Sequence, residues 1–180
     1  MAHRLQSGLT LLEALIALLV LALLLGTAVP ALSNATEAAR RGGALASLGG
    51  SLLDAVRHAT LTGSEVVLCP GDAGGCRRSV DWSKGWIAYA DLDHDRQRDP
   101  HETLLAAVAP LPGRVHLRST PGRTRLVFQP GGGNAGSNVT FTLCDGRGPA
   151  HATTVVLAND GRLRQGTPSA AAAEACMVPM

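Results

Sequence analysis

The chain has 180 residues, 46% hydrophobic and 17% charged, which is enough for one membrane or targeting segment and one modest globular domain but not for several domains. Its formal charge of +2 conceals an asymmetry. Residues 1–109 carry 9 Lys/Arg and 11 Asp/Glu, whereas residues 110–180 carry 7 Lys/Arg and 3 Asp/Glu, so the basic excess lies in the C-terminal part. With only 2 Trp, 1 Tyr and 2 Phe, the composition argues against a platform that stacks the bases of single-stranded nucleic acid.

The first predicted element is a long apolar segment near the N-terminus. The run Ala14–Leu32 approaches the roughly 20 residues that a helix needs to cross a bilayer, and it is interrupted only by Gly26, Thr27 and Pro30. A secretory signal cut after a small-x-small site such as Gly26-Thr27-Ala28 is one interpretation. However, the stretch exceeds the roughly 7–15 apolar residues usual in a signal peptide. It also opens with Glu13, a carboxylate whose charge costs about 2.5–3.5 kcal/mol in lipid, so a helix that stays on the protein is favoured.

The residues around this carboxylate carry a family resemblance. A short leader with Arg4, a Gly8-Leu9 junction, Thr10-Leu11-Leu12-Glu13 and a long apolar helix with Pro30 resemble the prepilin signature of type IV pilins and type II secretion pseudopilins. The resemblance implies that a prepilin peptidase and methyltransferase removes the leader, residues 1–8, after Gly8 and methylates Leu9. It also implies that Glu13 meets the N-terminal amine of a neighbouring subunit during assembly, since intramembrane ionisable groups usually have a partner. Leu9 stands where phenylalanine is usual in the family.

The apolar helix is predicted to continue into a more polar second half. Apolar residues recur there at three- and four-residue spacing, which is typical of an amphipathic helix: Leu45, Leu48, Leu52, Val56 and Ala59. We therefore expect a transmembrane helix over residues 9–32 and an amphipathic continuation over residues 33–63, with its apolar stripe against a globular domain. The glycine pairs at 42–43 and 49–50 weaken the helix by about 1 kcal/mol for each glycine and allow a bend.

Residues 64–180 are predicted to form a β-rich periplasmic domain. Short runs of β-forming residues alternate with turn residues, and strands are expected at Glu65–Cys69, Trp86–Ala90, Leu104–Val108, Val115–Arg118, Arg125–Gln129, Val139–Leu143, Thr153–Leu157 and Arg162–Gln165. The predicted fold class is α+β, a long N-terminal helix packed on an antiparallel β-sheet. The glycine-rich segment 130–138 is expected to be a flexible hairpin loop, and Ala170–Ala173 with its neighbours a loose tail.

The β region sharpens the resemblance to the GspH/FimT family of minor pilins and pseudopilins. The segments that carry it, in the family's order, are VVLCPGDAGGC, DWSKGWIAYADLD, LVFQPGGGNAGSNVTFTLC and VVLANDGRLRQ. The resemblance implies a type IV pilin-like fold and assembly with other minor pilins or pseudopilins and the major pilin. It also implies a single-pass inner-membrane protein whose C-terminal domain is periplasmic before assembly into the pilus or pseudopilus. Trp82 and Trp86 are interpreted as core anchors and not as a ligand-stacking pair.

Four cysteines, all beyond the apolar segment, suit disulfides in an oxidising compartment. Cys69 and Cys76 enclose a glycine-rich turn, which favours a local disulfide. Cys144 would then join Cys176 and tie the tail to the last sheet. Four cysteines allow three pairings, and the alternatives stay open on the sequence alone. A zinc site is disfavoured because paired Cys-x-x-Cys arms are missing.

The segment DLDHDRQRDPHE has the carboxylate spacing of a calcium-binding loop. The first, third, fifth, ninth and twelfth positions are occupied by Asp91, Asp93, Asp95, Asp99 and Glu102. Arg96, however, occupies the position where glycine makes the sharp turn, and strands, not helices, are expected on both sides. The sequence therefore favours a solvated acidic hairpin, and no metal or cofactor is predicted, although calcium binding by the loop stays open.

Arginines on the last predicted strand are the remaining chemical signal. After the turn Asn159-Asp160-Gly161, Arg162 and Arg164 are expected on one face of the strand, about 6.6 Å apart at roughly 3.3 Å per residue. Gly161-Arg162-Leu163-Arg164 is similar to a Gly-Arg-x-Arg motif that in FimT-like minor pilins is associated with binding double-stranded DNA during natural transformation. Further arginines could widen this basic surface, namely Arg114, Arg118, Arg123, Arg125 and Arg147. The alternative is an edge strand that its charges merely keep soluble.

Nothing in the sequence supports an enzyme. The six histidines are scattered, no nucleophile elbow is present, and the glycine-rich segment 130–138 lacks the Lys-Ser/Thr of a phosphate loop. Three functions remain: a structural subunit of a type IV pilus or type II secretion pseudopilus, a receptor for duplex DNA on the same scaffold, and a type II secretion protein H-like pseudopilin for protein export without DNA binding. The sequence does not say which machine recruits the chain.

Overall fold

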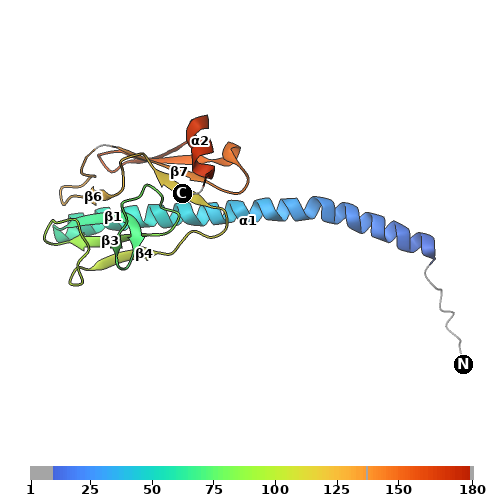
Figure 1. Cartoon of the computed structure of the whole chain (residues 1–180), viewed down its shortest axis with the longest axis horizontal. Helices are drawn as coiled ribbons and strands as arrows, with labels where there is room; N and C mark the ends of the chain where they lie inside the picture. Colours follow the sequence, from blue (N-terminus) through green and yellow to red (C-terminus); the bar gives the residue numbers. More distant parts are fainter. Residues whose placement is uncertain (1–9, 137, 179–180) are drawn as a thin grey trace, which may run out of the picture. The chain divides into compact units, whose positions relative to one another are not determined.

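The computed structural model describes residues 10–136 and 138–178. The chain divides into two compact units, one up to Thr36 and one from Glu37 onward. The helix α1, Leu11–Thr62, begins in the first unit and ends in the second (Figure 1). It is one helix of 52 residues with Pro30 inside it.

The second half of α1 is helical because one of its faces is buried. Ala44, Leu48, Leu52, Ala55 and Ala59 recur at three- and four-residue spacing and are all buried. The glycine pairs at 42–43 and 49–50 lie inside the helix and have open space where a Cβ would be. Burial of the apolar face therefore outweighs the low helix propensity of glycine. Of the predicted apolar stripe, Leu48, Leu52 and Ala59 are buried, whereas Leu45 and Val56 are partly buried and pack against the core.

Two antiparallel sheets follow α1. The first contains β1 Glu65–Asp72, β2 Gly75–Cys76, β3 Trp86–Asp91, β4 Leu104–Val108 and β6 Leu126–Phe128, in the order β2-β1-β3-β4 with β6 also paired with β1. The second, in the order β5-β7-β8-β9, contains β5 His116–Ser119, β7 Val139–Cys144, β8 Thr153–Leu157 and β9 Leu163–Gly166. A short 3-10 helix, Pro149–His151, lies between β7 and β8. Every strand predicted from the sequence is present with ends that differ by a few residues, whereas the two-residue β2 was not predicted.

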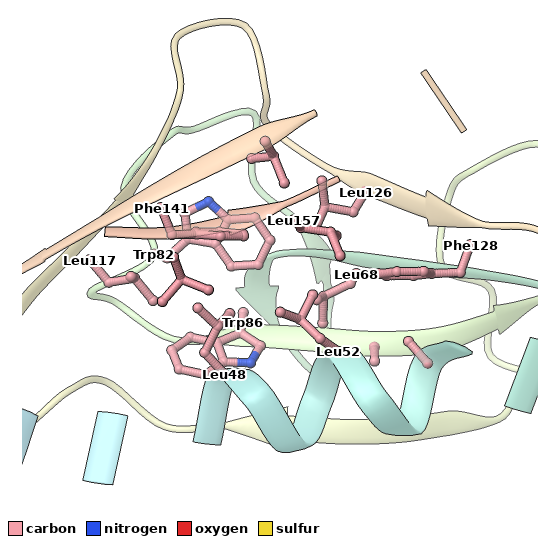
Figure 2. Packing of buried hydrophobic residues seen from close by; sticks show 14 of the residues in the cluster. Leu48, Leu52, Leu68, Trp82, Trp86, Leu117, Leu126, Phe128, Phe141 and Leu157 are labelled. Atoms are coloured by element: carbon pink, nitrogen blue, oxygen red, sulfur yellow. The ribbon is translucent and has the colours of Figure 1, made fainter. Parts of the chain in front are cut away.

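The core lies between α1 and the inner faces of both sheets (Figure 2). Trp82, Trp86 and Phe141 are fully buried there. The rings of Trp82 and Phe141 meet edge to face, with centroids 5.1 Å apart and planes at 86°. The indole Nε1 of Trp86 donates a hydrogen bond to Ser51 Oγ at 3.0 Å, which satisfies this polar atom inside the core. The interpretation of the two tryptophans as core anchors is confirmed.

The C-terminal segment is not a loose tail. It forms α2, Ala170–Met177, whose N-cap Ser169 accepts a hydrogen bond through Oγ from Ala172 N at 3.3 Å. On α2, Ala173 and Cys176 are buried, and Cys176 is bonded to a cysteine of β7. The expectation of a loose tail was wrong. Alanine is the best helix former, and the Ser169 cap and the disulfide further stabilise α2.

The middle of the glycine-rich loop 130–138 is packed in the part that the structure describes, since Gly133 and Asn134 are buried. Asn134 N donates to Asn159 O at 3.0 Å, and Ala135 N donates to Val127 O at 2.7 Å. Gly133 has φ +94°, and a Cβ there would lie 2.4 Å from Asn159 O, so no side chain fits. The loop therefore contacts the β8–β9 turn at Asn159, and its expected flexibility stays a prediction. Ser137 lies outside the described residues.

Candidate functional site

The first part of α1 is an exposed apolar surface. Every residue from Thr10 to Thr36 is exposed, and the helix contains an 18-residue window with a mean hydropathy of 2.7. Its large exposed apolar side chains are Leu11, Leu12, Leu15, Ile16, Leu18, Leu19, Val20, Leu21, Leu23, Leu24, Leu25, Val29 and Leu32. At about 1.5 Å per residue, roughly 20 helical residues match the hydrocarbon core of a bilayer. A surface of this kind needs lipid or other helices around it.

Glu13 lies in the first turn of α1 and forms a capping box with Thr10. Thr10 N and Oγ1 donate to Glu13 Oε2 at 3.0 and 3.1 Å, and Glu13 N donates to Thr10 Oγ1 at 3.2 Å. These reciprocal bonds satisfy backbone donors at the start of the helix. The sequence analysis missed this cap, although the Thr-x-x-Glu spacing was its signal. Glu13 is also the only ionisable residue from Thr10 to Thr36, so the apolar surface carries a single charge at its N-terminal end.

The predicted processing site, Gly8 and Leu9, lies outside the described residues. Cleavage after Gly8 would make Leu9 the first and Glu13 the fifth residue of the mature chain. The capping box would then stand at the new N-terminus, where the processed amine is created.

A buried ionic cluster joins the second half of α1 to the segment after β7. Asp145 is 0% exposed and accepts hydrogen bonds from Arg147 Nε at 2.9 Å and Arg147 Nη2 at 2.7 Å. Arg41 Nε lies 3.6 Å from Asp145 Oδ2, and Gly146 N donates to Glu37 Oε2 at 3.2 Å. Burial works to raise the pKa of Asp145, but the hydrogen bonds and charges of Arg147 and Arg41 outweigh it and hold the pKa below its usual range. The side chain of Arg147, 13% exposed, is thus engaged inside the protein.

Of the arginines near the C-terminus, Arg162 precedes β9, the edge strand of the second sheet, and Arg164 lies within it. Arg164 is exposed and pairs in register with Val156. Arg162 directly precedes β9, and its Nε lies 2.7 Å from Asp160 Oδ2. Gly161, with φ +81°, makes the turn between Asp160 and Arg162. A hydrogen bond from Arg162 N lowers the pKa of Asp160, so this carboxylate stays ionised and offsets one of the two positive charges.

Arg125 lies at a different place in the fold. It precedes β6 of the first sheet, and its Nη1 donates to Arg96 O at 3.0 Å. It lines a hollow of about 440 Å³ together with Arg77, Arg78, Arg96 and Arg98. The described residues therefore do not gather the predicted DNA-binding arginines into one patch. The sequence analysis missed the arginine-lined hollow because three separate segments, 74–78, 95–98 and 124–125, build it.

Two disulfides fix parts of the second unit. One joins Cys69 to Cys76 and closes the β1–β2 hairpin, with the Cα atoms 5.6 Å apart. The other joins Cys144 of β7 to Cys176 of α2, with the Cα atoms 6.2 Å apart. Together they use all four cysteines of the chain.

The acidic segment forms the loop between β3 and β4 and contains carboxylates close enough to hold a metal ion. One oxygen each from Asp91, Asp93 and Asp95 lies within 4.8 Å of the others. His94 and Arg96 both have positive φ, 65° and 60°, in the left-handed region that few non-glycine residues adopt. The loop is therefore tightly turned around its carboxylates.

A long helix with an exposed apolar first part and a second part packed on antiparallel sheets defines a type IV pilin-like subunit. The family described as "Type II transport protein GspH" matches residues 44–161, and the "Prokaryotic N-terminal methylation motif" matches residues 3–29. The chain therefore belongs to the type II transport protein GspH family, which confirms the resemblance drawn from the sequence. Among curated proteins, none matches the chain.

Solved structures of two minor subunits share the fold. The type IV minor pilin FimU of Pseudomonas aeruginosa is similar with a TM-score of 0.56 and 13% identity, over 77% of this chain and 92% of FimU. The minor pseudopilin EpsH from the type 2 secretion system of Vibrio cholerae is similar with a TM-score of 0.51 and 16% identity, over 72% of this chain and 98% of EpsH. At these identities the likeness shows the fold alone, and it confirms the predicted fold class.

Membership of the family makes the chain a pseudopilin-type structural protein and not an enzyme. Such proteins assemble with other pilins and are processed by prepilin peptidase. The apolar helix and the methylation motif fit an inner-membrane position before assembly.

Proposed function

We propose that this chain enters a filament through the first part of α1, as a minor subunit of a type II secretion pseudopilus or a type IV pilus. The observation that supports the proposal is the exposed apolar surface from Leu11 to Leu32 with one carboxylate, Glu13, at its N-terminal end. Lipid covers this surface while the subunit waits in the inner membrane, and helices of neighbouring subunits cover it after assembly.

Glu13 provides the specific contact in this proposal. Cleavage after Gly8 leaves a methylated amine on Leu9, which is a cation at the edge of an apolar surface. A pair between this amine and Glu13 of a neighbouring subunit leaves neither charge isolated in an apolar environment. The bonds from Thr10 hold the Glu13 carboxylate in place before the partner arrives.

Filament recovery tests this role. In cells that express the partner pilins, the full-length chain should be found in sheared filaments when prepilin peptidase is active. A Gly8→Glu variant, which blocks the predicted cleavage, should stay in the membrane fraction at wild-type abundance. Recovery of that variant in filaments, or absence of the wild type from them, would contradict the proposal.

We propose the capture of duplex DNA as a second role, which one observation favours. The side chains of Arg162 and Arg164 are both exposed at the edge of the second sheet. Two guanidinium groups there could each fork onto phosphate oxygens. Gly161 supplies the turn that presents them. Asp160 weakens the site because it pairs with Arg162.

Arg125 and Arg147 contribute nothing to this second role in the arrangement described above. The guanidinium of Arg125 is bonded to Arg96 O, and that of Arg147 to Asp145. The DNA proposal therefore rests on two arginines and predicts weak binding without sequence preference, because phosphate contacts do not read bases.

A gel-shift titration at two salt concentrations tests DNA binding. Changing Arg162 and Arg164 together to glutamine should flatten the slope of log K against log salt by roughly two units and weaken binding to every duplex alike. The matched control changes two exposed arginines elsewhere, Arg57→Gln and Arg78→Gln. Equal losses in both variants, or no binding by the wild type at low salt, would leave only the assembly role.

A further inference from the structure

We propose that the β3–β4 loop, residues 91–102, binds one Ca²⁺ ion through the carboxylates of Asp91, Asp93 and Asp95. The assembly role does not require a metal, so this site would be a separate property of the second unit. The first observation that supports this site is a buried carboxylate at the end of β3, Asp91.

Asp91 is 0% exposed, yet one of its oxygens lacks a donor. Its Oδ1 accepts a hydrogen bond from Arg96 N at 3.4 Å, but no donor within residues 10–136 and 138–178 reaches Oδ2. A desolvated carboxylate oxygen without a donor is unfavourable, and a cation beside it would remove the penalty.

Two further carboxylates converge on the same point. Oxygens of Asp91, Asp93 and Asp95 lie within 4.8 Å of one another. Oxygen ligands of Ca²⁺ lie roughly 2.3–2.6 Å from the ion, so two of them on opposite sides of it are separated by about 5 Å. The three oxygens therefore fit around one ion. Asp93 and Asp95 are exposed, which leaves a route for the ion and room for water ligands.

The backbone of the loop turns sharply at the sixth position of the calcium-loop spacing. Arg96, at the sixth position, has φ +60°, so it makes the sharp turn that usually needs glycine. This removes one of the two objections that the sequence raised against a metal, while the flanking elements are strands as expected. Glu102, at the twelfth position, is 3% exposed and closes the loop, because its Oε1 accepts from Leu92 N at 2.9 Å and its Oε2 from Asp99 N at 3.0 Å. With Asp91 and Glu102 buried, the loop is not the wholly solvated hairpin that the sequence favoured.

The ligand chemistry selects calcium among common ions. The converging groups are all carboxylate oxygens, which suit Ca²⁺ and Mg²⁺ better than Zn²⁺. Mg²⁺ demands a near-ideal octahedron and keeps most of its water, whereas Ca²⁺ accepts six to eight oxygens in flexible geometry. Because the flanking elements are strands, we expect an affinity in the range of extracellular modules, with Kd about 10⁻⁴–10⁻³ M.

The competing explanation is neutralisation by a histidine. His94 Nδ1 lies 3.5 Å from Glu65 Oε2, and these two residues form an overlapping group with Asp91. A protonated His94 would supply the positive charge without a metal. The variant His94→Ala, which should bind Ca²⁺ as the wild type does, separates the two explanations.

The test is calorimetric titration of CaCl₂ into the full-length chain, purified in detergent micelles and freed of metal with a chelator that is then removed. The same chain is titrated with MgCl₂ at equal ionic strength, and melting temperatures are recorded alongside. The variant Asp93→Asn/Asp95→Asn removes two exposed ligands and leaves buried Asp91 in place. The control Asp54→Asn/Glu174→Gln removes the same charge from exposed positions outside the loop.

The wild type and the control should bind about one Ca²⁺, with a rise in melting temperature of several degrees near saturation. The loop variant should bind at least about tenfold more weakly and, since both side chains are exposed, should melt like the wild type without calcium. Three results would each overturn the proposal. They are no binding by the wild type up to roughly 10 mM Ca²⁺, an equal response to Mg²⁺, and unchanged affinity in the loop variant.

Discussion

Glu13 stabilises the start of α1 and is also the one ionisable group from Thr10 to Thr36. These two properties can be separated, because glutamine can keep the reciprocal bonds of a capping box without the charge, whereas alanine keeps neither. Comparison of the two substitutions therefore distinguishes a role in helix capping from a role in pairing with another subunit.

Glu13→Gln and Glu13→Ala should both leave membrane insertion intact and lower recovery in sheared filaments by at least about tenfold, because the neighbouring amine loses its anion. Immunoblots of filament and membrane fractions measure the ratio. If Glu13→Gln assembles normally and only Glu13→Ala fails, the cap and not the charge is what assembly needs.

The buried carboxylate of Asp145 leads to a prediction about the stability of the second unit. Asp145→Asn should lower the free energy of unfolding by about 2–4 kcal/mol at neutral pH, because Arg147 and Arg41 lose their anion. Urea unfolding measures it, with the exposed Asp54→Asn as a control that should change little.

The same substitution has a pH dependence with a definite sign. The pKa of Asp145 is lower in the folded state, so its ionisation contributes stability at neutral pH that is lost as the pH falls below about 4 through the folded pKa. The difference between wild type and Asp145→Asn should therefore shrink in acid. A difference that stays constant from neutral pH to about pH 3 would show that the charge of Asp145 is not what stabilises the fold.

Among the elements, the two disulfides should contribute unequally. Their sequence separations are 7 for Cys69–Cys76 and 32 for Cys144–Cys176. Loop-closure entropy then predicts losses of about 2–3 and about 3.5–4 kcal/mol when each pair is replaced by serine. Thermal melts of the two double variants test the order, and thiol labelling of the unreduced wild type should find no free cysteine. A larger loss from the shorter loop would contradict the assignment of α2 as a docked element.

Replacing glycines of α1 by alanine should stabilise the fold, in contrast to removal of the disulfides. Gly43→Ala and Gly50→Ala should each raise the free energy of unfolding by about 0.5–1 kcal/mol, because both are helical and have open space at the Cβ position. Gly133→Ala is the contrasting control and should destabilise, since its Cβ would clash with Asn159 O. Thermal melts decide the signs, and destabilisation by Gly43→Ala would mean that this part of α1 is not the regular helix described.

The strands could be predicted from the sequence because alternating apolar residues and turn residues are local signals. α2 was not predicted, because its alanine tract has no apolar period. Its attachment depends on the disulfide between Cys176 and Cys144, a pairing that the sequence left open. The continuation of α1 through two glycine pairs was predicted from its apolar period, whereas the packing that outweighs the low helix propensity of glycine involves strands far along the chain.

The candidate site was less predictable than the fold. Arg125, Arg147 and Arg162 look alike in sequence but have different partners, namely Arg96 O, Asp145 and Asp160. For the last two a local signal existed, because an aspartate stands two residues before each arginine. The partner of Arg125 comes from another loop, so only the folded chain shows it.

At the scale of the whole molecule, the chain combines an exposed apolar helical segment with a folded unit closed by two disulfides. A discarded signal peptide would explain the length of the apolar segment less well, and it would give no role to Glu13 at its N-terminal end. The match of the methylation motif to residues 3–29 supports retention of the segment. The central claim is therefore that the helix stays on the mature protein.

Intact-mass analysis of the chain purified from membranes with active prepilin peptidase tests this claim most directly. Removal of 8 residues from 180 should leave a mature protein of 172 residues that begins with N-methyl-Leu9. The same preparation from cells without the peptidase should retain Met1 and lack the methyl group. A mature chain that begins near Val29, or one that still carries Met1 in cells with the active peptidase, would contradict the account.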